Sequence, residues 1–88
     1  MRSVAVDMSR SVYDPATDVM YFGLGQSRFT DEEEVAPGIH VLYAYDGKRL
    51  DEIVAVEIEY FEERFGDAER IEIPVAVPFA LELPLALA

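Results

Sequence analysis

The sequence has no cysteine, and it has a single histidine, His40. The chain therefore has neither a disulfide nor a thiolate metal site, and its 88 residues need a good apolar core, a partner subunit, or both. With one histidine and no serine in an elbow-like context, a Ser-His-Asp or Cys-His catalytic set has little support. A chain without cysteine suits the reducing cytoplasm, where we expect this protein to reside.

Basic residues are scarce too. Seven Lys and Arg residues face 18 Asp and Glu residues, which gives a formal charge of −11 at pH 7. The bases are scattered, and only Lys48 and Arg49 are adjacent. Direct binding to nucleic acid is therefore not expected, because it requires clustered bases that neutralise phosphates. An acidic surface serves solubility, or it attracts a basic partner protein.

Long apolar runs and phosphate-binding loops are missing as well. Residues 3–7 lack the apolar run of a signal peptide. The apolar C-terminal tail is interrupted by Pro74, Pro78, Glu82 and Pro84 and is too short to span a membrane. No glycine pair precedes a helix with the spacing of a phosphate-binding loop. We therefore expect no membrane association, no cofactor and no metal site.

The remaining pattern predicts a mainly β protein of the α+β class. Alternating apolar residues indicate strands over Ser3–Tyr13, Ile39–Tyr45 and Leu50–Glu59, and a run that is apolar on both faces indicates another over Val19–Leu24. The strands over Ile39–Tyr45 and Leu50–Glu59 are joined by an Asp46-Gly47 hairpin turn. Without repeats or a Ser/Gly-rich linker, we expect one domain over residues 1–88, with a small antiparallel β-meander over residues 3–59.

Between and after these strands, three segments have other patterns. Asp14–Asp18 is a turn in which aspartate side chains bond local amides. Asp31–Glu34 is expected to be a solvated acidic loop, with a short strand or a docking patch for a basic partner as alternatives. A short helix is predicted over residues 60–65, with Phe61 and Phe65 on one side and Gly66 as its end.

The tail, residues 70–88, has the clearest period of two. Every odd position from Ile71 to Leu87 is large and apolar, and every even position from Glu72 to Ala88 is Glu, Pro or Ala. An extended arm of this kind must lie on something, either the core of its own chain or a neighbouring subunit. Its prolines lie at even positions and limit it to partial, edge-like pairing. We expect a homo-oligomer, most simply a dimer, with candidate interaction or structural residues Ile73, Val75, Val77 and Phe79.

The order of the motifs resembles the uncharacterised domain family numbered 2283. The motifs are Tyr13-Asp14-Pro15, Asp18-Val19-Met20-Tyr21, Glu33-Glu34-Val35-Ala36-Pro37-Gly38-Ile39, Tyr45-Asp46-Gly47-Lys48-Arg49-Leu50 and Val56-Glu57-Ile58. The resemblance covers about residues 12–59. It implies a small antiparallel β-meander, with a short helix in some members, and antitoxin-like pairing with a small toxin-like protein.

Three acids and the histidine are the candidate polar sites. Asp14 and Asp18 could bind a cation or activate water, although turn chemistry explains them. Glu57 matches the family's glutamate; on a covered face it needs a partner such as Arg49 or His40, and on an open face it is an ordinary outward residue. His40 is expected at the rim of the core, bonded to a carboxylate.

Two functions of different classes follow from these patterns. The first is a small acidic protein-interaction module that associates with itself and docks a basic protein. The alternative is a small cation-dependent hydrolase in which Asp14, Asp18 and Glu57 converge in a pocket with raised or coupled pKa values. We favour the interaction module and therefore expect no enzymatic activity, with Asp14, Asp18 and Glu57 as further interaction or structural candidates.

Overall fold

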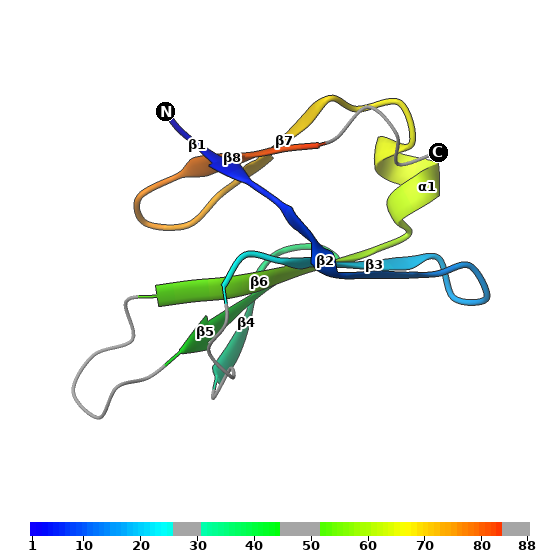
Figure 1. The fold of residues 1–88 in the computed structure, drawn as a ribbon, viewed down its shortest axis with the longest axis horizontal. Helices are drawn as coiled ribbons and strands as arrows, with labels where there is room; N and C mark the ends of the chain where they lie inside the picture. Colours follow the sequence, from blue (N-terminus) through cyan, green and yellow to red (C-terminus); the bar gives the residue numbers. More distant parts are fainter. Residues whose placement is uncertain (26–30, 45–51, 84–88) are drawn as a thin grey trace.

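The computed structural model describes residues 1–25, 31–44 and 52–83 of the chain. Its strands are β1 (Arg2–Ala5), β2 (Asp7–Asp14), β3 (Val19–Gly23), β4 (Asp31–Ala36), β5 (Ile39–Ala44), β6 (Glu52–Glu59), β7 (Arg70–Ile73) and β8 (Phe79–Glu82), and its helix is α1 (Phe61–Phe65). They form a five-stranded antiparallel sheet in the order β2-β3-β6-β5-β4 and a three-stranded sheet in the order β1-β8-β7 (Figure 1). The mainly β fold with one short helix is thus confirmed.

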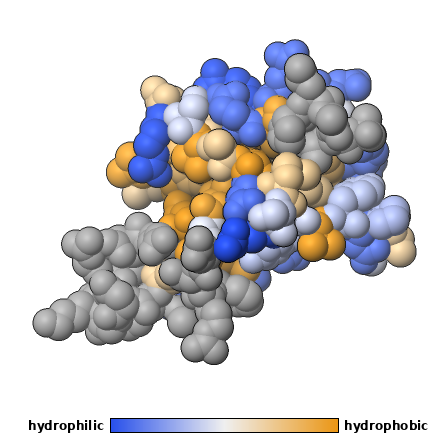
Figure 2. All heavy atoms as spheres, viewed as in Figure 1, coloured by the Kyte–Doolittle hydropathy of each residue, from blue (hydrophilic) through white to orange (hydrophobic). Residues whose placement is uncertain are grey.

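The two sheets face each other, and α1 lies at one end of the pair (Figure 1). Strand alternation gives each sheet an apolar face, and these two faces meet in a common core. A second, smaller buried cluster of Leu42, Val54 and Ala55 lies apart from that core. On the side seen in Figure 2, hydrophobic residues gather along the middle of the molecule, with hydrophilic ones around them. The largest fully buried side chains are Phe22, Phe79, Met20, Leu42, Ile58, Ile73, Leu81, Val41 and Val56.

The C-terminal arm supplies most of the second sheet. Strands β7 and β8 form an antiparallel hairpin, and β8 pairs in parallel with β1 from Arg2↔Phe79 to Ala5↔Glu82. Ile73, Phe79 and Leu81 are fully buried against the five-stranded sheet of the same chain. Burying a side chain of this size contributes about 1.5–3 kcal/mol, so the arm accounts for a large part of the core.

The arm is not one continuous apolar face. Between β7 and β8 the chain bends, Val75 is half-buried, and Val77 is 78% exposed although it continues the odd-numbered row. Pro74 directly follows β7 and Pro78 directly precedes β8. Because proline cannot donate to a ladder, these positions end the two strands instead of interrupting one. The partly β arm is confirmed, but its alternation holds only within two short strands.

The expectation of one strand over Ser3–Tyr13 is wrong. The chain leaves the three-stranded sheet after Ala5 and enters the five-stranded sheet at Asp7, with Val6 between them (Figure 1). Alternation does not reveal this break, because the apolar row of Val4, Val6 and Met8 runs through it, although Val4 and Val6 pack against the core and Met8 is exposed. The expected solvated loop at Asp31–Glu34 is also wrong, since these acids open β4. The ladder with β5 pairs one side of this strand, and its four acidic residues are exposed. The predicted Asp46-Gly47 turn and the tail beyond Leu83 lie outside the described residues.

Strand β2 approaches β3 closely at one glycine. The β2–β3 register shifts between Asp7 and Val12, so several residues of β2 face a single stretch of β3. In this bulge the Ser11 hydroxyl accepts a hydrogen bond from the Gly23 N–H at 3.0 Å. A Cβ at Gly23 would lie 2.5 Å from the Cβ of Arg10 and 2.6 Å from its carbonyl oxygen. The close packing of the two backbones therefore depends on the missing side chain.

Among the described residues, no helix is long and apolar enough to cross a membrane.

Candidate functional site

A polar cluster around His40 lies on the outer face of the five-stranded sheet, away from the common core. Glu34 near the end of β4 and His40 near the start of β5 are cross-strand partners, because the chain turns between them at Pro37-Gly38. Gly38 has φ +74°, which glycine adopts without strain. Glu59, the last residue of β6, is held beside this turn because its N–H donates to the Gly38 carbonyl at 2.8 Å.

Three carboxylates surround the imidazole of His40, whose side chain is 19% exposed. Its Nε2 lies 2.7 Å from Glu59 Oε2 and 3.7 Å from Glu34 Oε2, and its Nδ1 lies 3.5 Å from Glu32 Oε2. The hydrogen bond to Glu59, with smaller contributions from the charges of Glu32 and Glu34, raises the pKa of His40 above 6.5, although partial burial acts in the opposite direction. The cluster therefore favours a positive charge at the imidazole.

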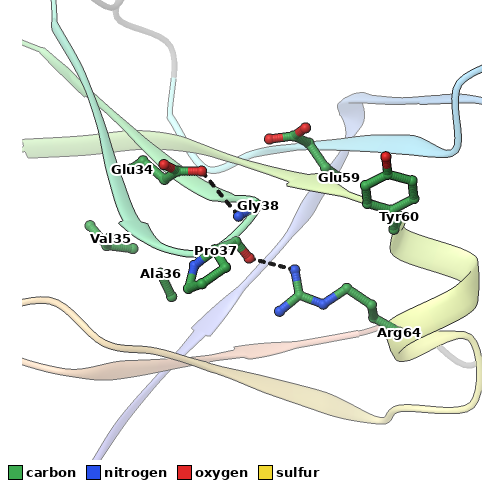
Figure 3. Close-up of a pocket in the computed structure, with 8 residues that line it drawn as sticks. All are labelled: Glu34, Val35, Ala36, Pro37, Gly38, Glu59, Tyr60 and Arg64. Atoms are coloured by element: carbon green, nitrogen blue, oxygen red, sulfur yellow. Dashed lines mark hydrogen bonds between the residues drawn. The ribbon is translucent and has the colours of Figure 1, made fainter.

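A cavity opens next to this cluster, around the turn between β4 and β5 (Figure 3). Its volume is ≈ 780 Å³, and its lining residues are Glu34, Val35, Ala36, Pro37, Gly38, Glu59, Tyr60 and Arg64. Glu34 and Glu59 lie on one side of the turn, and Arg64 reaches it from α1 on the other. Two hydrogen bonds fix these side chains: the Gly38 N–H donates to Glu34 Oε2 at 3.1 Å, and Arg64 Nη1 donates to the Pro37 carbonyl at 2.6 Å.

The acidic strand β4 borders the same cluster. It is an edge of the five-stranded sheet, and within the described part of the chain it pairs with β5 alone. The side chains of Asp31, Glu32, Glu33 and Glu34 are all exposed. Because they alternate between the two faces, the edge carries carboxylates on both sides. Burial raises the pKa of Tyr43, and the negative charge of Glu33 raises it further.

Asp14 and Asp18 lie in the turn between β2 and β3, at the same end of the strands as Glu59, and have structural hydrogen bonds. The Asp14 carboxylate accepts bonds from the Ala16 N–H at 2.9 Å and the Thr17 hydroxyl at 3.0 Å. Asp18, at φ 56°, accepts the Glu62 N–H at 2.8 Å on Oδ1 and thereby caps the start of α1. The hydrogen bond from the Glu62 N–H is the main reason why the pKa of Asp18 is lowered.

The cap at Asp18 is reinforced from both sides. The Tyr13 hydroxyl donates to Asp18 Oδ1 at 2.8 Å, and the Phe61 N–H donates to the Asp18 carbonyl at 3.0 Å. Tyr60, between β6 and α1, has φ 55°, a sparsely populated conformation for an aromatic residue. The turn after β2 therefore fixes how the chain leaves β6, which places Tyr60 and Arg64 at the cavity.

Glu57 lies in the outer row of β6, two residues before Glu59. It is half-buried, and its cross-strand partners are His40 on β5 and Tyr21 on β3. Arg49, its other expected partner, lies outside the described residues. Strand β3 separates Glu57 from Asp14, and the carboxylates of Asp14 and Asp18 have different hydrogen-bond partners. The geometry thus gives the hydrolase alternative no support.

The four arm candidates fall into two groups. Ile73 and Phe79 are buried in the core and Val75 is packed against it, whereas Val77 projects into solvent. Sequence reasoning missed Glu34 and Glu59 as members of the polar cluster. Glu34 could have been found, because it and His40 stand on either side of the Pro37-Gly38 turn. Glu59 could not, because its place depends on the β5–β6 register.

Comparison with known proteins gives one positive result. No curated protein and no solved structure matches the chain significantly. The family model described as "Protein of unknown function (DUF2283)" matches residues 10–62, more than half of the chain. This segment includes the turn that caps α1, the strands β3, β4, β5 and β6, and all members of the His40 cluster. The chain therefore belongs to the DUF2283 family of proteins of unknown function.

Proposed function

We propose that this protein is a cytoplasmic protein-interaction module whose acidic edge strand β4 binds an extended basic segment of a partner protein. The carrying observation is that Asp31–Glu34 form an exposed strand at the edge of the five-stranded sheet. An edge strand presents backbone N–H and C=O groups to which an extended segment adds by main-chain hydrogen bonding. The antitoxin-like pairing implied by the family resemblance is one form of such binding.

Charge decides which partner suits this edge. A second copy of β4 would bring like charges directly opposite one another, which destabilises pairing. A segment with lysine or arginine at every second position would instead place its cations on one face, beside Asp31 and Glu33 or beside Glu32 and Glu34. The net charge of −11 also attracts a basic partner at long range.

We assign self-association to the opposite edge, β2. Its residues Met8, Val12 and Tyr13 are exposed and apolar, and Val12 is 64% exposed. This edge has Asp7, Arg10 and Asp14 in place of the acidic run of β4, so two copies can pair there with fewer like charges opposed. The dimer expected from the sequence would then form through β2, while the arm stays on its own chain.

The docking proposal is tested by fluorescence anisotropy with a labelled peptide of alternating lysine and valine. We expect the full chain to bind this peptide, more weakly as NaCl rises from about 50 to about 300 mM. A peptide with proline in place of valine keeps the charge but removes half of the N–H donors, and it should bind worse. Light scattering of the same protein over a concentration series tests dimer formation, and a single monomer mass throughout contradicts it.

Two double variants distinguish binding at the β4 edge from attraction by the overall negative charge of the protein. Asp31→Asn with Glu33→Gln removes two charges from β4, and Glu62→Gln with Glu63→Gln removes two exposed charges from α1. At about 0.2–1 kcal/mol for each exposed ion pair, the β4 variant should lose roughly twofold to thirtyfold in affinity. Equal losses in both variants, or equal binding of the proline peptide, would show that docking at β4 is wrong.

A further inference from the structure

We propose that Glu34, His40 and Glu59 form a site for a divalent cation of the Zn²⁺ class, with Glu32 supporting the histidine. Each of the three residues offers one ligand atom, and these atoms lie within 4.8 Å of one another. The three come from three adjacent strands, β4, β5 and β6, so the sheet itself fixes their spacing. The site shares Glu32 and Glu34 with the β4 edge, but metal binding rests on a different chemistry, and Asp31 and Glu33 belong to the edge alone.

The distances fit a metal with short bonds. Zn²⁺ binds nitrogen and oxygen at about 2.0–2.2 Å, so the ligands of a tetrahedral site lie roughly 3.3–3.6 Å apart. His40 Nε2 and Glu34 Oε2 are 3.7 Å apart, close to that spacing. Nε2 and Glu59 Oε2 are 2.7 Å apart and share a hydrogen bond, which a metal would replace. Glu59 is 42% exposed, so its carboxylate has room to move by the fraction of an ångström required.

Neighbouring groups orient two of the three ligands. Glu32 Oε2 lies 3.5 Å from His40 Nδ1, on the side of the ring opposite the metal-binding nitrogen. A carboxylate in that place holds the Nδ1 proton, leaves Nε2 free to bind, and makes the imidazole a stronger ligand. The Gly38 N–H, at 3.1 Å, fixes the position of Glu34 Oε2. Gly38 thus orients Glu34 as Glu32 orients His40.

Charge also favours a divalent cation. Glu32, Glu34 and Glu59 lie around one imidazole, and a single proton on His40 cannot balance all three carboxylates. Imidazole suits Zn²⁺ and similar first-row metals, whereas Ca²⁺ and Mg²⁺ prefer oxygen ligands alone. Three protein ligands leave the fourth position of a tetrahedral ion open toward the cavity beside the β4–β5 turn.

The test is calorimetric titration of the full chain, stripped with EDTA, with ZnCl₂ at about pH 7.5, since metal binding must displace protons from its ligands. We expect one Zn²⁺ per chain. His40→Gln and Glu59→Gln should weaken binding at least about tenfold, and Glu32→Gln by about tenfold. Glu57→Gln is the matched control, because it removes the same charge from the same face of β6 without removing a ligand, and its affinity should stay within about twofold of the parent.

Two further measurements make the result decisive. Co²⁺ in place of Zn²⁺ should give the visible absorption of a four-coordinate ion in the parent chain and in Glu57→Gln, and not in Glu59→Gln. Asp31→Asn with Glu33→Gln should leave Zn²⁺ binding intact even if docking at β4 is lost. Absence of binding, equal losses in Glu57→Gln and Glu59→Gln, or displacement of Zn²⁺ by an equal concentration of Ca²⁺ would each overturn the proposed site.

Discussion

Two substitutions in the C-terminal arm test how the arm is held. Ile73 and Val77 occupy the same odd-numbered row, yet Ile73 is fully buried and Val77 is 78% exposed. Ile73→Val removes one methylene from a packed side chain, and Val77→Ala removes two methyl groups from a solvated one. We therefore expect the smaller chemical change to have the larger effect on the free energy of unfolding.

The expected magnitudes follow from burial. Ile→Val in a packed core costs about 0.5–1.5 kcal/mol, whereas substitution at an exposed site usually stays within about 0.5 kcal/mol. For a domain of this size each kcal/mol lowers the melting temperature by about 4–8 °C. At roughly 0.05–0.15 kcal/mol per residue the parent chain is only marginally stable, so the conservative Ile73→Val is preferred to Ile73→Ala.

The assay is urea unfolding followed by circular dichroism, repeated at two protein concentrations. The second concentration separates folding from association, because the stability of an obligate dimer would rise with concentration. Equal destabilisation by Ile73→Val and Val77→Ala would mean that the hairpin connection is as buried as β7. A larger effect at Val77, growing with concentration, would mean that the arm is held by a second chain, and the packing of the arm on its own sheet would be refuted.

Two other predictions concern His40 and Gly23. Because its carboxylate neighbours raise the pKa of His40, the protonated ring stabilises the fold fully below about pH 6.5, and this contribution disappears as pH rises through the elevated native pKa. In EDTA, the difference in free energy of unfolding between the parent and His40→Gln, on the order of 0.5–1 kcal/mol, should therefore shrink above pH 6.5, and a pH-independent difference would contradict this. Gly23→Ala should cost about 1–3 kcal/mol by urea unfolding, because its Cβ would lie 2.6 Å from the Arg10 carbonyl oxygen, and an unchanged midpoint would show that β2 and β3 are not packed so closely.

Much of the fold could be predicted because its signals are local. Period-two alternation located β5, β6 and the strands of the arm, an apolar run located β3, and Phe61 with Phe65 indicated α1. The residue types of the Asp14–Asp18 turn also predicted that aspartate side chains bond local amides, and Asp14 does accept the Ala16 N–H and the Thr17 hydroxyl. What these signals could not give was the capping of α1 by Asp18, since the Glu62 N–H lies 44 positions away.

The candidate site was less accessible from the sequence. The sequence predicted His40 at the rim of the core, bonded to a carboxylate, and Glu57 was the acid named as its possible partner. Glu57 is indeed its cross-strand partner, but the 2.7 Å bond goes to Glu59, which the Gly38 carbonyl holds beside the turn. A one-residue difference in register would have turned every one of these side chains to the core face.

The sequence by itself determined where most of the strands lie, the acidic character of the Asp31–Glu34 segment and the short helix, because these depend on neighbouring residues. The tertiary structure decided which members of an apolar row are buried, where the first strand divides between two sheets, and which acids surround His40. These features depend on pairings between distant strands, such as β6 between β3 and β5, or β1 beside β8. Alternation constrains which face a residue occupies, but only the assembled sheets determine what that face meets.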